Sequence, residues 1–222
     1  LSPFMSTDSH NHGSADTPAE ISGDRPAPWA IFLDLSKPRL AFLSTLSGVA
    51  GYLAAPDDFE VLGFFAVGVA IFLAAAGALA LNQVIERKVD AQMERTKNRP
   101  LPSGQITAGP AILLGIASSL LGCGIAALFL PATSTILIVA TVLIYVLIYT
   151  PMKRYTHWCT HVGAIPGALP PLIGWSAATG TIDGLGLWLF FILLLWQMPH
   201  FFAIAWLYRA DYAQGGLQMV SV

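Results

Sequence analysis

The chain has 222 residues, of which 55% are hydrophobic and 11% are charged, with a formal net charge of −2 at pH 7. A soluble domain of this size carries roughly a quarter charged residues, because its surface needs them. The composition therefore excludes an ordinary soluble globular protein. It favours an integral membrane protein, for which we expect no nucleic-acid partner.

The first thirty residues form a polar tail. They are rich in Ser, Asp, His, Gly and Pro, show little periodicity and contain no apolar signal-peptide core. The pattern predicts a disordered tail at 1–30, followed by one membrane domain at 31–222. His10 and His12 fall in the tail, where a solvated segment is favoured over a metal site.

Four stretches contain no Asp, Glu, Lys or Arg, and about 20 apolar residues suffice for a membrane helix. The longest stretch, 100–152, has room for two helices separated near Pro131. The fifth helix carries Pro166, Pro170 and Pro171, so we expect it to be broken and interior, where protein or a cavity satisfies the freed backbone groups. The sequence thus predicts an all-α polytopic transmembrane bundle with six membrane helices, at 40–55, 61–81, 108–130, 133–149, 161–179 and 185–207.

All eleven Lys and Arg residues fall on one side of this arrangement. The opposite loops contain Asp57, Asp58, Glu60 and Asp183 and no base. By the positive-inside rule the N-terminus and the basic loops are cytoplasmic. The expected location is the plasma (inner) membrane of a bacterium.

Three oxygen-bearing side chains continue the second helix past the membrane edge. Asn82, Glu86 and Asp90 are spaced i, i+4, i+8, so a helix places them along one face. Such a row suits Mg²⁺, which prefers carboxylates together with substrate phosphates and keeps some waters. An ordinary solvated helix end is the alternative, and the spacing alone does not decide between the two.

A cluster of bases follows directly, with Arg95, Lys97 and Arg99 inside five residues. Arg and Lys are the usual partners of phosphate oxygens. Membrane topology or contact with anionic lipids would explain the bases but not the acidic row. Together, the two features favour a metal-bridged diphosphate on a lipid-soluble substrate.

These residues also carry a family resemblance. The run NQVIERKVDAQMERTKNRPLPSG at 82–104 resembles the first signature of the UbiA superfamily of intramembrane prenyltransferases. Four further stretches resemble the haem-farnesylating branch of that superfamily: YTPMKR at 149–154, GALPPLIGW at 167–175, WQMPHF at 196–201 and DYAQGGLQM at 211–219. Lys37–Pro38–Arg39 also fits this branch. The resemblance therefore spans about 35–222.

The sequence departs from the family at three points. Glu86 stands where the family more often has Asp, and Lys88 stands where relatives are often acidic, so Lys88 is not counted as a ligand. The family is expected to have nine membrane helices, which leads us to expect that this chain is truncated at its C-terminus.

The resemblance implies transfer of a farnesyl group from farnesyl diphosphate to a vinyl group of protohaem IX, with Mg²⁺ as cofactor and haem as substrate. The products would be diphosphate and haem O, on the route to the haem A of terminal oxidases. The implied catalytic and metal-binding residues are Asn82, Glu86, Asp90 and a second acidic site at Asp211. The implied diphosphate-binding residues are Arg95, Lys97 and Arg99, with Lys153 and Arg154 as further candidates.

Three histidines are candidates for haem contact. His200 lies in the sixth membrane helix near its cytoplasmic end, and imidazole is a common ligand of haem iron. A hydrogen-bonded structural histidine near Gln197 is the alternative, and we expect both side chains to line one cavity face. His157 and His161 flank the cytoplasmic end of the fifth helix. Cys123 and Cys159 are expected to be inert packing residues.

Two rival functions remain open at this stage. A UbiA-type enzyme that prenylates an aromatic or quinone precursor would share the first signature. A membrane transporter would also contain broken helices and intramembrane polar groups, but these usually gather at mid-bilayer. The sequence leaves the oligomeric state open.

Overall fold

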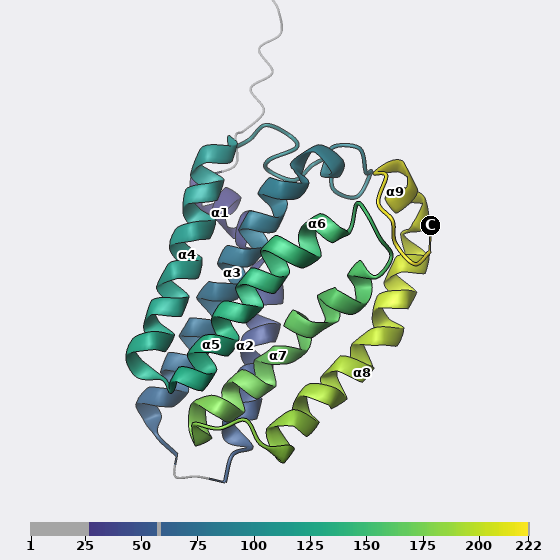
Figure 1. The fold of residues 1–222 in the computed structure, drawn as a ribbon. Helices are drawn as coiled ribbons and strands as arrows, with labels where there is room; N and C mark the ends of the chain where they lie inside the picture. Colours follow the sequence, from purple (N-terminus) through teal and green to yellow (C-terminus); the bar gives the residue numbers. More distant parts are fainter. Residues whose placement is uncertain (1–26, 57–58, 222) are drawn as a thin grey trace, which may run out of the picture.

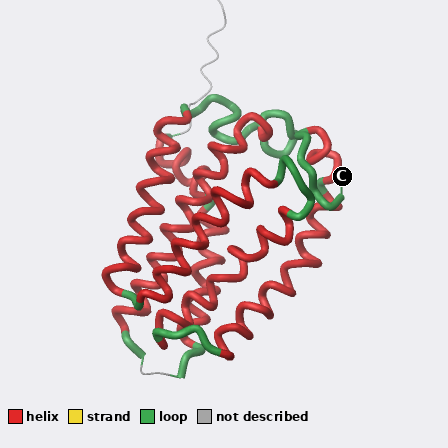
Figure 2. The backbone as a smooth tube through the Cα atoms, in the orientation of Figure 1, coloured by secondary structure: helices red, strands yellow, loops and turns green. Residues whose placement is uncertain are grey.

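The computed structural model describes residues 27–56 and 59–221. Within these ranges every regular element is helical, which confirms the all-α class (Figure 2). The predicted tail lies almost wholly outside the described residues, as do Asp57 and Asp58, and residues 28–30 already belong to the first helix. The elements are α1 (Pro28–Ser36), α2 (Pro38–Leu53), α3 (Val61–Asp90), α4 (Ala108–Phe129), α5 (Ala132–Leu143), the π-helix η1 (Ile144–Tyr149), α6 (Thr150–Met152), α7 (Cys159–Thr179), α8 (Gly184–Leu207) and α9 (Arg209–Gln214).

The long helices run alternately up and down in one bundle (Figure 1). Each of the six predicted membrane helices coincides with a helical segment. Four of these, α3, α4, α8 and the continuous span Ala132–Met152, are long and apolar enough to cross a membrane. Because α2 has only 16 residues and α7 contains three prolines, the count of six crossings stays a prediction.

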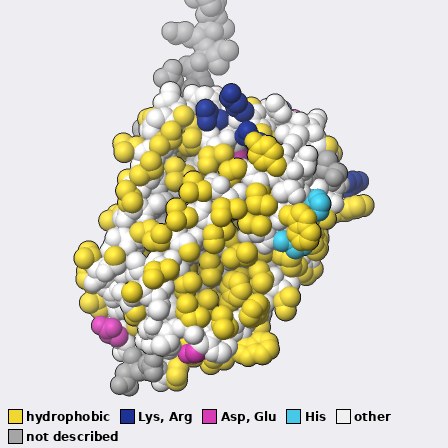
Figure 3. Space-filling view, in the orientation of Figure 1, with side chains coloured by type: hydrophobic (Ala, Val, Ile, Leu, Met, Phe, Trp, Pro, Cys, Tyr) yellow, Lys and Arg dark blue, Asp and Glu magenta, His cyan; other side chains and the backbone are white. Residues whose placement is uncertain are grey.

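Charged side chains lie toward the two ends of the bundle. Figure 3 shows the Lys and Arg side chains of this face gathered toward the upper end, with a broad apolar surface below them. Glu60 and Asp183 are the N-cap residues of α3 and α8, at the opposite end of the bundle. Large apolar side chains such as Leu113, Leu120 and Leu128 of α4 are 66–78% exposed, as expected for a surface that faces lipid.

The fifth predicted membrane helix is interior but not broken. Helix α7 continues through Pro166, Pro170 and Pro171, and all three prolines are buried. The expectation of a broken helix was therefore wrong. Proline removes a backbone donor and crowds the preceding turn, but α7 tolerates this because it is packed between α2 and α8.

Helices α2 and α7 approach so closely that only glycine fits between them. A Cβ atom on Gly174 would overlap the carbonyl oxygen of Gly48, and one on Gly51 would overlap the backbone of Pro171. Small residues at such crossings are the usual way for membrane helices to pack backbone against backbone. The contact fixes α2, and the residues just before it, relative to the centre of the bundle.

This contact predicts that Gly174→Ala lowers the free energy of unfolding by about 1–3 kcal/mol, the usual range for overpacking a tight core. The measurement is thermal unfolding of the purified protein in detergent. Gly124→Ala is the matched control, because a Cβ atom there meets nothing within 4 Å. Equal stability of the two variants would contradict a backbone-limited contact.

Candidate active site

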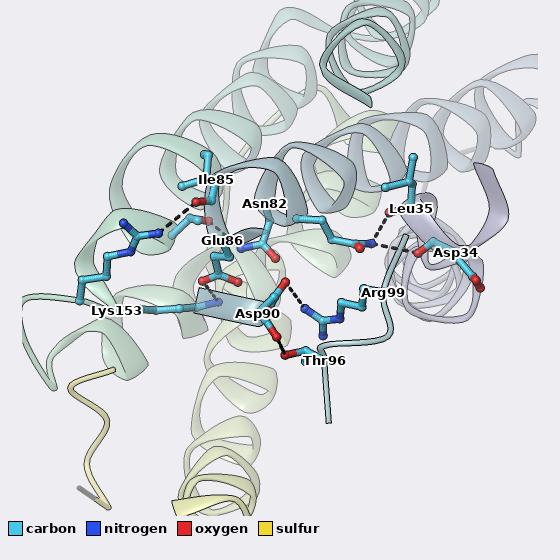
Figure 4. A network of polar contacts seen from close by, with 12 residues as sticks. Asp34, Leu35, Asn82, Ile85, Glu86, Asp90, Thr96, Arg99 and Lys153 are labelled. Carbon is cyan, nitrogen blue, oxygen red and sulfur yellow. Dashed lines mark hydrogen bonds and ion pairs between the residues drawn. The ribbon is translucent and has the colours of Figure 1, made fainter. Parts of the chain in front are cut away.

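The last turns of α3 carry the predicted row of oxygen ligands. Asn82, Glu86 and Asp90 are only 2%, 7% and 1% exposed. Figure 4 shows the three side chains on one side of α3, within a single network of polar contacts. The predicted common helix face is therefore confirmed, and the row is buried rather than a solvated helix end.

Each carboxylate of the row is paired with one base. Arg99 Nη1 lies 2.7 Å from Asp90 Oδ2, and Lys153 Nζ lies 2.8 Å from Glu86 Oε1 (Figure 4). Thr96 Oγ1 donates to the Asp90 carbonyl at 2.8 Å, which fixes the start of the loop that carries Arg99. Arg99 donates a hydrogen bond to Asp90, while Lys153 and Glu86 form an ion pair. Both pairs are largely buried, and each carboxylate charge is compensated by a base.

The other predicted bases point elsewhere. Lys97 is exposed and pairs with Glu94. The guanidinium of Arg95 lies 4.4 Å from the ring centroid of Tyr208, and Arg154 donates to the Ile85 carbonyl at 3.0 Å. Of the five predicted diphosphate-binding bases, the structure therefore directs only Arg99 and Lys153 at the acidic row.

Lys37 is a further base at this site that was not singled out for a role from the sequence. It joins α1 to α2 and is the one non-glycine residue in the described chain with positive φ, at φ 44° and ψ 62°. Burial, together with the neighbouring charges of Arg99 and Lys153, lowers the pKa of Lys37 to about 7. A strained backbone of this kind persists only where the surrounding structure holds it. The only sequence signal was the Lys37–Pro38–Arg39 motif.

Asp211 lies apart from the acidic row. It is half-buried in the first turn of α9. In the part of the chain that the structure describes, no three His, Cys, Asp or Glu side chains gather closely enough to hold one metal ion. The structure therefore does not bring Asp211 into a cluster with Glu86 and Asp90, and its role remains a prediction.

An apolar cavity of about 280 Å³ lies among α2, α3, α5, η1, α7 and α8. Tyr149 belongs to its lining, and the Tyr149 ring centroid lies 4.5 Å from Lys153 Nζ, so the cavity adjoins the polar site. Further along the same cavity the lining is formed by apolar side chains that include Ile71, Ile138 and Ile173. The site thus consists of a charged end and an apolar chamber.

The three candidate histidines are exposed and lie among aromatic rings. The His200 ring stacks on Trp196 of α8 at 5.5 Å, while His161 of α7 lies 4.9 Å from Trp158 and 6.0 Å from Phe202. These five residues are called the histidine strip below. His157 lies 5.7 Å from Trp158 at its end.

Gln197 and His200 do not share a cavity face, so that prediction was wrong. Gln197 is buried, and its side chain occupies the space that a Cβ atom on Gly167 would need. His200 lies on the exposed side of α8 and is not part of the cavity lining. The space at Gly167 thus accommodates the Gln197 side chain, whereas the His200 ring stacks on Trp196 on the exposed side of α8.

The sequence pattern of the UbiA prenyltransferase family matches residues 41–222. The chain belongs to this family. It is 39% identical over 196 residues to a protoheme IX farnesyltransferase of Opitutus terrae, covering 88% of this chain and 66% of the relative. It is 42% identical over 201 residues to one of Solibacter usitatus, covering 86% and 69%. The chain thus spans about two thirds of the length of these relatives.

The UbiA fold is also seen in a solved structure. A UbiA homolog from Archaeoglobus fulgidus bound to GPP and Mg²⁺ superposes with a TM-score of 0.69 at 17% identity, covering 86% of this chain and 68% of that one. Family membership and the four membrane-length helices together make this chain an integral membrane protein.

The burial of the acidic row in this UbiA-family chain predicts a large cost for removing one base. Arg99→Ala leaves the Asp90 carboxylate buried without its partner, and breaking such a pair costs about 3–5 kcal/mol of stability. Lys97→Ala removes a solvent-exposed pair and should change stability by less than about 1 kcal/mol. Thermal unfolding of both variants checks the difference, and an equal loss would mean that the Arg99 pair is not structurally important.

Proposed function

We propose that this chain is the greater part of a protohaem IX farnesyltransferase. The observation that carries the proposal is a buried acidic row, paired with bases, at the end of an apolar cavity in a UbiA-family fold. The names of the curated relatives support the choice of substrates. The reaction yields haem O, the precursor of haem A.

Bond changes in the proposed reaction follow electrophilic chemistry. The allylic C–O bond of farnesyl diphosphate breaks, and diphosphate leaves with the bonding electrons. The terminal carbon of the haem vinyl group forms the new C–C bond, and water adds to the adjacent carbon with loss of a proton. The protein's part is to position both substrates, neutralise the leaving group and keep water from the allylic cation until the bond has formed.

The acidic row fits Mg²⁺. Its donors are two carboxylates and one amide oxygen, and within the described residues Asp90 Oδ1 is buried without a hydrogen-bond partner. Mg²⁺ takes hard oxygen ligands of this kind together with substrate phosphates and water. When bound, the ion neutralises negative charge on the departing diphosphate. Asn82, Glu86 and Asp90 would hold it, whereas Asp211 of α9 would form a separate acidic site, since it does not cluster with Glu86 and Asp90 in the described structure.

The bases hold the diphosphate. Arg99 and Lys153 already reach the acidic row, and Lys37 lies close enough for their charges to affect its pKa. A pKa near 7 allows Lys37 to take up a proton when an anion arrives, so its charge increases with substrate binding. Arg95, Lys97 and Arg154 have other partners in the described structure and are weaker candidates.

The farnesyl chain occupies the apolar cavity, whose lining offers the charge-free surface that an isoprenoid requires. Protohaem lies against the histidine strip, where His161 or His200 is available as an iron ligand and the aromatic rings present flat surfaces to a porphyrin. The active-site end faces the cytoplasm of a bacterium, because the described bases gather there.

The metal assignment predicts that Glu86→Gln and Asp90→Asn each lower haem O formation by about 10²–10³-fold, the usual cost of removing one key electrostatic contact. The measurement is haem O produced in membranes from farnesyl diphosphate, haem and Mg²⁺. Glu94→Gln is the matched control, because Glu94 is exposed in the adjoining loop. Near-normal activity of both row variants would refute the proposal.

The acceptor assignment predicts that His200→Ala and His161→Ala weaken haem binding while farnesyl diphosphate binding stays unchanged. Replacing the residue that ligates the iron should weaken haem binding at least about tenfold, equivalent to 1.4 kcal/mol. Absorbance titration with haem and a separate titration with farnesyl diphosphate distinguish the two substrates. Prenylation of a hydroxybenzoate, with no haem binding by the wild type, would favour an aromatic acceptor instead.

A further inference from the structure

The amide of Asn82 is held by a hydroxyl group from another part of the bundle. Asn82 Nδ2 lies 3.2 Å from Thr150 Oγ1, at the junction of η1 and α6. Thr150 is only 1% exposed, and its Oγ1 in turn donates to the Tyr145 carbonyl at 2.7 Å. A buried relay therefore runs from Asn82 through Thr150 to the backbone of η1.

The direction of this relay follows from counting protons. A hydroxyl group has one proton to donate and can accept through its lone pairs. Because Thr150 gives its proton to Tyr145, it can only accept from Asn82. The NH₂ group of Asn82 must therefore face Thr150, and the amide oxygen must face the other way, as Figure 4 shows it turned toward Asp90.

The π-helix supplies the acceptor for this relay. In η1 the backbone N–H of Thr150 bonds to the Tyr145 carbonyl, five residues earlier. The Thr150 side chain therefore lies over the same carbonyl, which has two lone pairs and can accept both bonds. Single π-turns inside α-helices are often associated with functional sites, and here one aims a hydroxyl at the acidic row.

We propose that Thr150 is a positioning residue that keeps Asn82 in the one amide orientation in which it is an oxygen donor to the metal. Turned over, Asn82 would present two N–H donors to the cation and one oxygen to a hydroxyl that has already given its proton away. This inference rests on the proposed Mg²⁺ site. It adds a residue that touches neither metal nor substrate.

The test measures the Mg²⁺ requirement without turnover. Farnesyl thiolodiphosphate, which does not readily ionise, is bound to the purified membrane protein at a series of Mg²⁺ concentrations. Thr150→Val keeps the shape but removes the hydroxyl, and the half-saturating Mg²⁺ concentration should rise about fivefold to tenfold. Thr150→Ser keeps the hydroxyl, so its half-saturating Mg²⁺ concentration should stay within about twofold of the wild-type value. Thr135→Val is the matched control, since that hydroxyl bonds the Pro131 carbonyl near the other end of the same helical span.

A double-mutant cycle separates orientation from general damage. Asn82→Asp places an oxygen on both sides of the group, so there is no amide left to orient. In that background Thr150→Val should change the Mg²⁺ requirement by less than twofold. An equal shift in both backgrounds, or no shift with Asn82 present, overturns the inference. If Asn82→Ala raises the Mg²⁺ requirement and Thr150→Val does not, the proposed Mg²⁺ site is supported but the inference about Thr150 is refuted. If Asn82→Ala has no effect, Asn82 is not a metal ligand, and this part of the proposed function fails along with the inference.

Discussion

Two buried carboxylates at the end of a membrane helix set the main constraint on this structure. Glu86 and Asp90 are almost fully removed from water, and an uncompensated charge there would cost several kcal/mol. Their partners come from separate connecting segments, Arg99 from the loop after α3 and Lys153 from the end of α6. The acidic row therefore fixes where these segments lie, and the ordering of this end of the bundle follows from charge compensation.

The same constraint prepares the site for an anion. With equal numbers of paired acids and bases, the row is nearly neutral, and Lys37 adds a positive charge that burial makes easy to lose. In the proposed reaction the cation and the diphosphate each meet groups that are already held in place by these pairs, rather than groups recruited from solvent. These charged side chains are thus ordered during folding, so little further free energy is needed to order them when a substrate binds, as in other preorganised electrostatic sites.

Much of this arrangement follows from the sequence. Charge-free stretches placed the long helices, and the i, i+4, i+8 spacing placed Asn82, Glu86 and Asp90 on one face. Spacing could not show which bases reach the acids, because that depends on the path of the loop after α3, where Thr96 and the aromatic partners of Arg95 set the direction of each side chain.

Two further features depend on packing that no short sequence window reveals. The continuity of α7 through three prolines depends on its neighbours, and the inward turn of Gln197 depends on the missing side chain at Gly167. The role proposed for Thr150 depends on a π-turn, which has no reliable signature in a single sequence.

The glycine contact between α2 and α7 makes one wall of the cavity stiffer than the others. Where two backbones touch without side chains between them, no rotamer change can widen the gap, so this wall is stiff. The rest of the lining consists of side chains, among them Thr141 and Val142, so the shape of the cavity there depends on which residues occupy those positions. The cavity therefore has one wall whose position is fixed by backbone contact and other walls whose shape is set by side chains. Natural variation in the depth of the cavity should be found mainly among those side chains.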